Sequence, residues 1–198
     1  MLLAGAPELS EVRAILKDIV DDDVRASDII DNIRMLLRKE EPTTRTVDLN
    51  EICSHAARLL KGDAMLRGAR LELRLEPQLP PVAGDPVQLQ QAVLNLALNA
   101  LDATAGSAGE HEVTVGTVVR GNEAELFIRD TGPGLTPELQ EHLFESIYTT
   151  KAHGLGLGLV IVRSIVERHH GRVYAETAAG RGAIFRVLLP VPPVSSIH

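Results

Sequence analysis

Aromatic residues, cysteine and positive charge are all scarce in this sequence. Its 198 residues include no Trp, two Tyr, three Phe and one Cys, and 20 Lys+Arg against 27 Asp+Glu give a formal net charge of −7. Because nucleic-acid surfaces need clustered cations and aromatic stacking platforms, we expect no nucleic-acid partner. The single cysteine, Cys53, allows no internal disulfide and has no companion ligands for zinc, which favours a reducing, cytoplasmic setting.

Long apolar segments are missing as well. No apolar run in the sequence approaches the roughly 20 residues that a membrane-spanning helix needs. The first residues also lack the basic segment, followed by an apolar one, that marks a signal peptide. We therefore expect no membrane contact by this chain. The hydrophobic content of 44% predicts a globular protein of one or two domains with a sizeable core.

The first part of the chain has the pattern of one long helix. Between Ser10 and Lys39, apolar residues recur at three- and four-residue steps, at Val12, Leu16, Ile19, Ala26, Ile30, Ile33 and Leu37. A stripe this long needs other helices to bury it, so we expect a hairpin partner outside the chain and a second copy. A helix folded back on the following domain is the alternative. Since Pro42 disfavours helix before it, we expect three parts, residues 1–43, 44–192 and a tail at 193–198.

Helix and strand signals alternate in the second part. Helices are expected at about 48–60, 86–104 and 159–169, and strands at about 71–75, 112–119, 124–129, 172–177 and 184–189. Asp48 with Glu51, and Asp85 with Gln88, have the spacing of capping boxes at two of the helix starts. The order of these elements predicts an α/β domain.

Turn residues separate several of these elements. Gly121-Asn122 is a typical two-residue turn for a hairpin between the second and third strands. Gly171 is expected to end the last helix. The residues before it, His169 and His170, are expected to form a basic last turn, where the helix dipole favours cations.

The helix that begins at Pro86 carries a polar stripe. At 100° per residue, Leu89, Val93, Leu96 and Ala100 share one face, and the opposite face carries Gln88, Gln91, Asn95, Asn99 and Asp102. A merely solvated stripe is the alternative, but it would more naturally consist of Glu and Lys, because asparagine is a middling helix former. Two amide oxygens one turn apart can complete the shell of a magnesium ion that already carries phosphate oxygens and water.

Two glycine-rich segments follow. Asp130-Thr-Gly-Pro-Gly134 directly follows a strand, where a flexible turn lets a ligand approach the backbone; a bare turn is the alternative. Gly154-Leu-Gly-Leu-Gly158 precedes a helix, so its N–H groups and the helix N-terminus can hold phosphates, or it can serve as a hinge. The second segment has neither the Gly-Lys-Ser/Thr of a Walker loop nor the spacing of a Rossmann fingerprint.

In this order, the segments resemble four sequence boxes of sensor histidine kinases. The N box, first glycine box, F box and second glycine box correspond to Asn95–Ala103, Asp130–Leu135, Leu143–Glu145 with Thr149–Lys151, and Gly154–Leu159. The resemblance covers about Val47 to Pro190 and extends to the helix before it. It implies the Bergerat, or GHKL, fold: an α/β two-layer sandwich with a mixed sheet, helices on one face and a mobile lid over ATP. The long N-terminal helix would then be the second helix of a dimerisation hairpin.

The resemblance also implies ATP and Mg²⁺ as ligands. Asn99 resembles the magnesium ligand, with Asn95 beside it, and Asp130 resembles the acceptor for the adenine amino group; guanine would present a carbonyl oxygen there instead. The resemblance places Lys151 and His153 in the lid, where a cation would screen the terminal phosphate; Lys151 is equally typical of an ordinary surface lysine, and His153 is more typical of the surface than of the site. The catalytic candidates are Asn95, Asn99 and Lys151. The nucleotide contacts are Asn99, Asp102, Asp130, Gly132, Gly134, Lys151, Gly154, Leu155, Gly156, Leu157 and Gly158.

The chain departs from the family pattern at two points. Ala183 stands where the family usually has threonine, so one polar contact is missing. None of the seven histidines is followed by the acidic residue and proline of a phosphoacceptor box. The resemblance therefore implies a kinase truncated after its acceptor helix, which moves the γ-phosphoryl group of Mg·ATP to a histidine outside this chain. Its partners would be that helical segment, a response regulator receiver domain and, in the full-length homodimer, a second copy.

Two other functions stay open. ATP-hydrolysing chaperone and mismatch-repair relatives carry a glutamate, as general base, one turn before the metal-binding asparagine. Here that position is Asn95, whose amide cannot take a proton, so hydrolysis should be slow. A non-catalytic partner-switching module is the third reading, and the intact boxes argue against it. The affinity for Mg·ATP would distinguish it from the enzymes.

Overall fold

A computed structural model of the protein describes residues 45–105, 107, 109–144, 157–178 and 182–192, together with Val12 and Leu16. The chain divides into two compact units, Met1–Lys39 and Glu40–His198. In the first unit, Val12 and Leu16 are helical and exposed. The rest of the predicted long helix lies outside the described residues, as do the 145–156 segment and the predicted tail.

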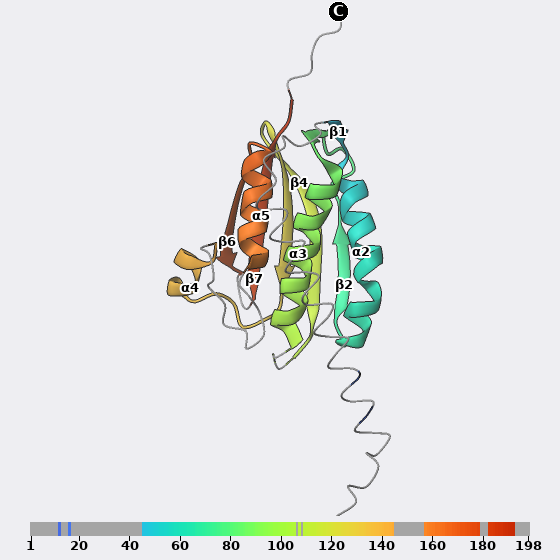
Figure 1. The fold of residues 1–198 in the computed structure, drawn as a ribbon, viewed down its shortest axis with the longest axis vertical. Coiled ribbons are helices and arrows are strands. Elements are labelled where there is room, and N and C mark those ends of the chain that lie inside the picture. The colour runs from blue at the N-terminus through green and yellow to red at the C-terminus, as the bar shows by residue number, and fades with distance from the viewer. Residues whose placement is uncertain are drawn as a thin grey trace, which may run out of the picture. The chain divides into compact units, whose positions relative to one another are not determined.

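The second unit contains one five-stranded sheet and one small strand pair (Figure 1). The order of the sheet is β2 (Arg70–Arg74), β4 (Glu112–Arg120), β5 (Glu123–Asp130), β7 (Ala183–Pro190) and β6 (Arg172–Thr177). β2 runs parallel to β4, and every other pairing in the sheet is antiparallel. β1 (Arg45–Val47) pairs antiparallel with β3 (Val82–Gly84). The sheet is therefore mixed, as predicted.

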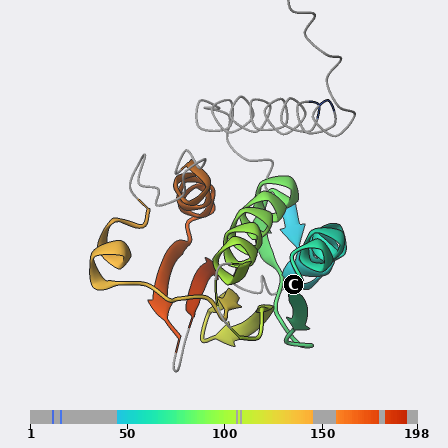
Figure 2. The same ribbon diagram turned by 90° about the horizontal axis from the view of Figure 1, so that it is seen from below.

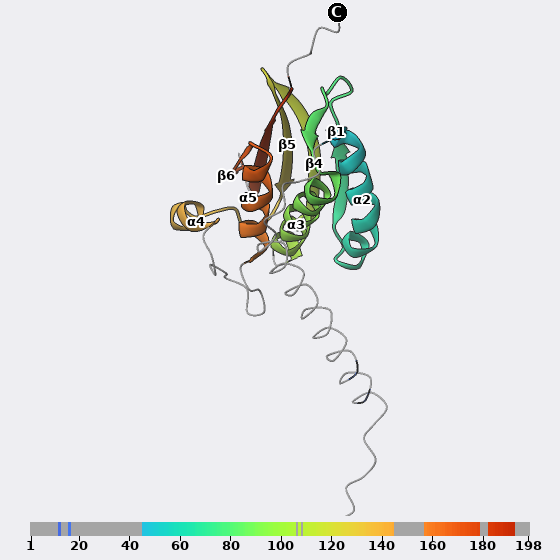
Figure 3. The ribbon, with the colours of Figure 1, turned by 45° about the horizontal axis from the view of Figure 1, so that its top comes forward.

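Three helices cover one face of this sheet (Figures 1 and 2). They are α2 (Leu49–Leu66), α3 (Pro86–Ala105) and α5 (Leu157–Arg168), with α3 in the middle. A short helix, α4 (Pro137–His142), lies to the side of this layer near β6 (Figure 3). The predicted two-layer α/β sandwich is confirmed. No helix in the described part of the chain is long and apolar enough to cross a membrane.

The core lies between the helix layer and the sheet. The predicted apolar face of α3 is buried, and Leu96 and Ala100 are completely inaccessible to solvent. Below it, the alternate residues Ala124, Leu126 and Ile128 of β5 are buried as well, because side chains on a strand point to opposite faces in turn. Each large aliphatic side chain buried in this way contributes about 1.5–3 kcal/mol to the free energy of unfolding.

The structure corrects several expected element boundaries. The helix expected to end near residue 60 continues to Leu66, and its C-cap residue Arg67 donates its backbone N–H to Asp63 and Met65. β1, β3 and α4 were not predicted, because three-residue strands and a six-residue helix are too short for a periodic pattern. The predicted hairpin turn at Gly121-Asn122 is confirmed, with Gly121 at φ 60°.

The capping box predicted at Asp85 forms only in part. Oδ1 of Asp85 accepts the N–H groups of Val87 and Gln88 at 2.9 and 3.3 Å. The Gln88 side chain does not accept the backbone N–H of Asp85, because Nε2 of His169 does so at 2.9 Å. Gln88, which the sequence placed on the polar face of this helix, is buried.

The end of α5 differs from the prediction too. His170, with φ 58°, adopts the left-handed conformation that a glycine was expected to supply. Its N–H donates to Glu167 and that of Gly171 donates to Val166, which is a Schellman motif. Gly171 is needed for space, since a Cβ atom there would lie 2.4 Å from the Leu188 carbonyl oxygen. His169 is buried rather than part of a basic surface turn.

Candidate nucleotide-binding site

The carboxylate of Asp130 lies at the end of β5, and the residue is only 1% exposed. Its Oδ1 atom accepts the backbone N–H groups of Gly132 at 2.8 Å and Ala183 at 3.1 Å. Burial raises the pKa of Asp130, and these two hydrogen bonds together with the charge of Arg129 act against that rise. Within the described residues both bonds end on Oδ1, which leaves Oδ2 for a donor on a ligand.

The backbone around Asp130 is packed so closely that side chains would not fit. A Cβ atom on Gly182, whose φ is 92°, would lie 1.9 Å from the carbonyl oxygen of Asp130. A Cβ atom on Gly132 would lie 2.9 Å from the carbonyl oxygen of Ala103 in α3. Gly134 has a φ of 84°. The glycines thus let the end of α3, the turn after β5 and the start of β7 meet around one carboxylate.

Thr131 anchors the turn that follows Asp130. Its N–H donates to the carbonyl oxygen of Glu112 at 3.2 Å. Its hydroxyl donates to the carbonyl oxygen of Glu110 at 2.6 Å and accepts the N–H of Glu112 at 3.0 Å. These bonds hold the turn to the start of β4, so the glycines beside Asp130 keep a fixed path.

The predicted polar stripe on α3 lies between the two flanking helices. Asn95, Asn99 and Asp102 are all half-buried. Nδ2 of Asn95 lies 3.5 Å from the carbonyl oxygen of Gly158 in the first turn of α5. The structure therefore brings the N box next to the end of the second glycine box, although 63 residues separate the two contacting positions.

Asp102 leans the other way, toward α2. Its Oδ1 atom forms an ion pair with Nη1 of Arg67, which also lies 3.3 Å from Asp63 through Nη2. Sequence reasoning assigned Asp102 to the nucleotide and missed Arg67, since no local pattern links positions 35 residues apart. The pair ties the C-terminal half of α3 to the end of α2.

The other predicted phosphate-binding residues divide into two groups. Leu157 and Gly158 lie in the first turn of α5, and a Cβ atom on Gly158 would have no neighbour within 4 Å beyond its own helix. The remaining members lie outside the described residues: Lys151, His153, Gly154, Leu155 and Gly156. The structure thus describes the parts of the predicted site around Asp130 and along α3.

Ala183 has a role that the sequence did not indicate. The missing threonine side chain suggested one polar contact fewer at this position. The contact with Asp130 is instead made by the backbone N–H of Ala183, which any residue other than proline supplies. The departure from the family pattern therefore leaves this hydrogen bond intact.

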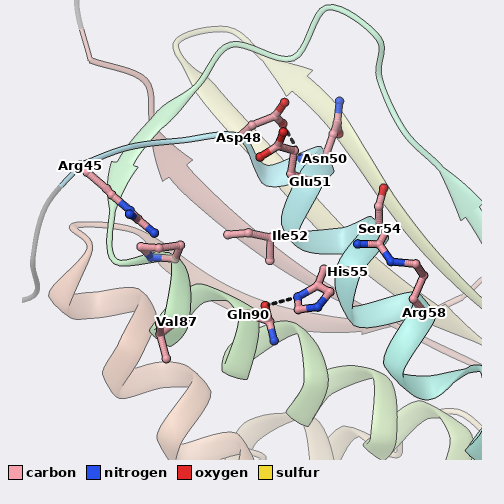
Figure 4. A pocket seen from close by; sticks show the side chains of 11 residues that line it. Arg45, Asp48, Asn50, Glu51, Ile52, Ser54, His55, Arg58, Val87 and Gln90 are labelled. Atoms are coloured by element: carbon pink, nitrogen blue, oxygen red, sulfur yellow. Dashed lines mark hydrogen bonds between the residues drawn. The ribbon is translucent and has the colours of Figure 1, made fainter.

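A separate hollow of about 630 Å³ lies between the first turns of α2 and α3 (Figure 4). Its lining mixes cations and carboxylates, including Arg45, Arg58, Asp48 and Glu51. A hydrogen bond of 2.7 Å between Nδ1 of His55 and Oε1 of Gln90 crosses from one helix to the other. None of the predicted nucleotide-binding residues lines this hollow, so it is not the candidate site.

The possible ligands for a metal ion are limited in kind. Among the described residues there is no group of three or more His, Cys, Asp or Glu side chains that could hold one. Asn95 and Asn99 present amide groups one turn apart on α3. Such neutral oxygens fit Mg²⁺ only as a supplement to the oxygens of a bound phosphate and water.

Comparison with known proteins gives matches to a family model and to curated relatives. Residues 84–193 match the family described as histidine kinase-, DNA gyrase B- and HSP90-like ATPase. The sensor histidine kinase TmoS of Ectopseudomonas mendocina is 34% identical over 188 residues, which are 93% of this chain and 19% of TmoS. The chain therefore spans about a fifth of the length of this curated relative.

Two solved structures extend the likeness to the fold. Full-length ShkA in complex with AMPPNP matches with a TM-score of 0.76 and 25% identity, over 96% of this chain and 40% of ShkA. Histidine kinase ThkA in complex with the response regulator protein TrrA matches with a TM-score of 0.73 and 20% identity. That match covers 96% of this chain and 53% of ThkA.

Proposed function

This chain belongs to the histidine kinase-, DNA gyrase B- and HSP90-like ATPase family, and on that premise we propose that it is the Mg·ATP-binding catalytic part of a sensor histidine kinase. It would transfer the γ-phosphoryl group of ATP to a histidine on a dimerisation helix outside the chain. Two contacts carry the proposal. The glycine turn after Asp130 packs against the end of α3, and Asn95 of α3 approaches the first turn of α5.

Asp130 would select the base. Adenine presents an amino group, a hydrogen-bond donor, where guanine presents a carbonyl oxygen. With Oδ1 held by two backbone N–H groups, the carboxylate is fixed in place before a ligand arrives. A buried carboxylate oxygen that faces the carbonyl oxygen of guanine would lose its hydrogen bond, which costs about 1–3 kcal/mol and so favours adenine.

The phosphates would lie between α3 and α5. The N-terminus of α5 offers N–H groups and the positive end of the helix dipole to an anion. The amide oxygens of Asn95 and Asn99 would bind a magnesium ion that is also held by the phosphates, and such an ion neutralises charge on the β- and γ-phosphates during transfer. Lys151 and the predicted glycines Gly154 and Gly156 would complete the phosphate side of the site.

Catalysis would rest mainly on positioning and electrostatic stabilisation. The acceptor nitrogen of the histidine forms the new bond to phosphorus while the bond to the β,γ-bridging oxygen breaks, so ADP leaves with that oxygen. The residues of this chain hold the nucleotide in line and exclude water. Asn95 has no basic lone pair with which to activate water, which favours transfer over hydrolysis.

The proposed partners follow from this reaction. The acceptor helix belongs to the same kinase, and the full-length protein would be a homodimer in which a second copy completes the helical bundle. The phosphohistidine formed in this reaction would then donate its phosphoryl group to an aspartate of a receiver domain. The solved complex of ThkA, a protein of the same fold, with the response regulator TrrA supports a receiver domain as the partner type. A cytosolic location would give the site its ATP.

A transfer assay tests the proposal. This chain is mixed with a separately produced dimerisation hairpin of the same kinase and with ATP labelled at the γ-phosphate. We expect label on the hairpin with the unaltered chain and none with Asn99→Ala or Asp130→Ala. The matched control is Glu125→Gln, which alters a buried carboxylate on the other side of the same strand and should preserve transfer.

The same assay distinguishes the two alternative functions. Rapid release of labelled phosphate without label on the hairpin would favour an ATP-hydrolysing relative. Binding of Mg·ATP with neither transfer nor release would favour a partner-switching module. Calorimetry that detects no uptake of ATP by the folded chain would contradict the proposed site altogether.

A further inference from the structure

The imidazole of His169 connects the two helices that flank the proposed phosphate site. The residue follows α5 directly and is 3% exposed. Its Nε2 atom accepts the backbone N–H of Asp85 at 2.9 Å, and its Nδ1 atom lies 2.7 Å from the carbonyl oxygen of Ile165. An N–H group can only donate, so Nε2 carries no proton. The ring is therefore neutral, with its proton on Nδ1 and donated to Ile165.

The residues around the imidazole ring leave space for it. A Cβ atom on Gly84 would lie 2.6 Å from Cδ2 of His169 and 2.9 Å from the Leu89 side chain. Gly84 ends β3, whose pairing with Arg45 of β1 fixes the position of the strand. The absence of a side chain at position 84 thus lets the imidazole reach the backbone at the start of α3.

The ring also completes the N-terminus of α3. The side chain of Asp85 accepts two N–H groups of the first turn, from Val87 and Gln88. The backbone N–H of Asp85 itself points the other way and donates to His169. Asp85 is therefore hydrogen-bonded both to the first turn of α3 and to the residue that follows α5.

His169 and Asn95 each make a polar contact that joins α3 and α5 within the described residues. The helices run in opposite directions, so His169 meets the start of α3 while Gly158, at the other end of α5, meets Asn95. The second contact lies where the proposed function places the phosphates and the metal ion. The first contact lies about one helix length away, outside the nucleotide site.

We propose that His169 is a positioning residue for the triphosphate: it fixes the start of α3 against the end of α5 and thereby the spacing between Asn95 and the N-terminus of α5. The inference rests on the proposed function, because it assumes that phosphates lie between these helices. His169 does not touch the ligand. Its loss should weaken the triphosphate contacts and leave the adenine contact at Asp130 in place.

Protonation should have the same effect as loss of the side chain. A proton on Nε2 would turn the acceptor into a donor that faces another donor, the N–H of Asp85. Burial lowers the pKa of His169, as do the charges of its chain neighbours Arg168 and His170, while the hydrogen bond to Ile165 and the charge of Asp85 raise it. The neutral form therefore holds the contact at neutral pH, and acidification below the ordinary histidine pKa releases it.

Two substitutions separate the acceptor from the bulk of the ring. His169→Gln keeps an acceptor oxygen near the position of Nε2, and His169→Leu keeps apolar volume but leaves the N–H of Asp85 unpaired. Binding of adenosine and of Mg·AMPPNP is measured by calorimetry for both variants and the unaltered chain, from pH 7.5 to 5.5. His55→Gln, at the exposed helix contact of Figure 4, is the control.

We expect His169→Leu to lower the affinity for Mg·AMPPNP about tenfold at pH 7.5, the effect of one lost hydrogen bond, and to change adenosine binding less than twofold. His169→Gln should stay within about threefold for both ligands. As the pH falls, the unaltered chain should lose Mg·AMPPNP affinity more steeply than His169→Gln. This difference removes the contribution of the phosphate's own titration.

Each other outcome has a defined meaning. Equal losses for adenosine and Mg·AMPPNP in His169→Leu would overturn the positioning role, because a general loss of structure affects both. Parallel pH profiles for the unaltered chain and His169→Gln would also overturn it, even if His169→Leu fails to fold. Failure of the unaltered chain to bind either ligand would overturn the proposed function and this inference together.

Discussion

Two carboxylates on β5, Asp130 and Glu125, are each only 1% exposed but have opposite surroundings. Five positions separate them, so they point to opposite faces of the sheet, Asp130 toward the helices. Glu125 accepts a hydrogen bond from Nε of Arg120 at 2.9 Å and forms an ion pair with Arg186. Asp130 is bonded to two backbone N–H groups. At equal burial, Glu125 is paired with arginine side chains, whereas Asp130 is held by backbone N–H groups and, within the described residues, has no such partner.

The difference shows how to distinguish a structural carboxylate from a binding one. Arg186 also bonds Glu176 on the neighbouring strand, at 2.7 Å, so with Arg120 the charge of Glu125 is part of a network across four strands, β4, β5, β7 and β6. Both oxygens of Glu125 have a guanidinium partner. The bonds that Asp130 accepts both end on Oδ1, and the residue lies at a strand end among glycines that let three backbone segments pack closely around it.

Gly182→Ala tests the rigidity of the binding side and should have the largest effect. The added methyl group would lie 1.9 Å from the carbonyl oxygen of Asp130, at a φ of 92° that alanine disfavours. We expect a loss of about 3 kcal/mol or more in the free energy of unfolding, together with loss of ATP binding. Urea denaturation and calorimetry would measure the two effects. A stable variant that still binds ATP would show that the backbone around Asp130 can shift to accommodate the added methyl group.

Asp130→Asn separates binding from stability. The amide oxygen can still accept the N–H groups of Gly132 and Ala183, but an NH₂ group replaces Oδ2 and would face the amino group of adenine. We expect ATP affinity to fall about a hundredfold, equivalent to about 2.7 kcal/mol. Calorimetry with ATP and ADP would measure the loss.

The stability of this variant has an expected pH dependence. The folded state raises the pKa of Asp130, so ionisation is less favourable in the folded chain than in the unfolded one. The unaltered chain should therefore lose stability, relative to Asp130→Asn, as the pH rises through the pKa of Asp130. A variant that is less stable than the unaltered chain at neutral pH would contradict this reasoning and indicate that the carboxylate has a structural role like that of Glu125.

Glu125→Gln should give the opposite result. A neutral amide cannot balance the two guanidinium groups of Arg120 and Arg186, and the side chain of Arg186 is only 18% exposed. We expect the free energy of unfolding to fall by about 2 kcal/mol, with ATP affinity unchanged within twofold. Chemical denaturation and calorimetry of the same preparation would test this. A loss of ATP affinity as large as that of Asp130→Asn would remove the distinction between the two faces.

The local parts of the site were predictable from the sequence. Asn95 and Asn99 share a helix face because four residues make about one turn, and Asp130 precedes a glycine turn that any strand end could carry. The order of the four boxes then specified the fold, and the mixed sheet with helices on one face confirms it. Each box is a short run of residues, and only their order along the chain extends beyond local sequence.

The contacts that complete the site could not be predicted in this way. The N–H of Ala183 reaches Asp130 across 53 positions, and Arg67 reaches Asp102 across 35. His169 has the sequence context of a basic helix end, but its burial depends on Gly84, far earlier in the chain. Only tertiary packing brings these residues together, and the periodicity of the sequence does not predict such contacts.

Gly62→Ala should have the smallest effect and lies away from both carboxylates. Gly62 is an exposed residue in the interior of α2, and a Cβ atom there would meet nothing within 4 Å. Alanine lowers the conformational entropy of the unfolded chain, so we expect a gain of about 0.5–1 kcal/mol in the free energy of unfolding. ATP affinity should not change. Thermal and urea denaturation would measure the gain, and a change in ATP affinity would mean that the stability of α2 is transmitted to the nucleotide site through the contact between Arg67 and Asp102.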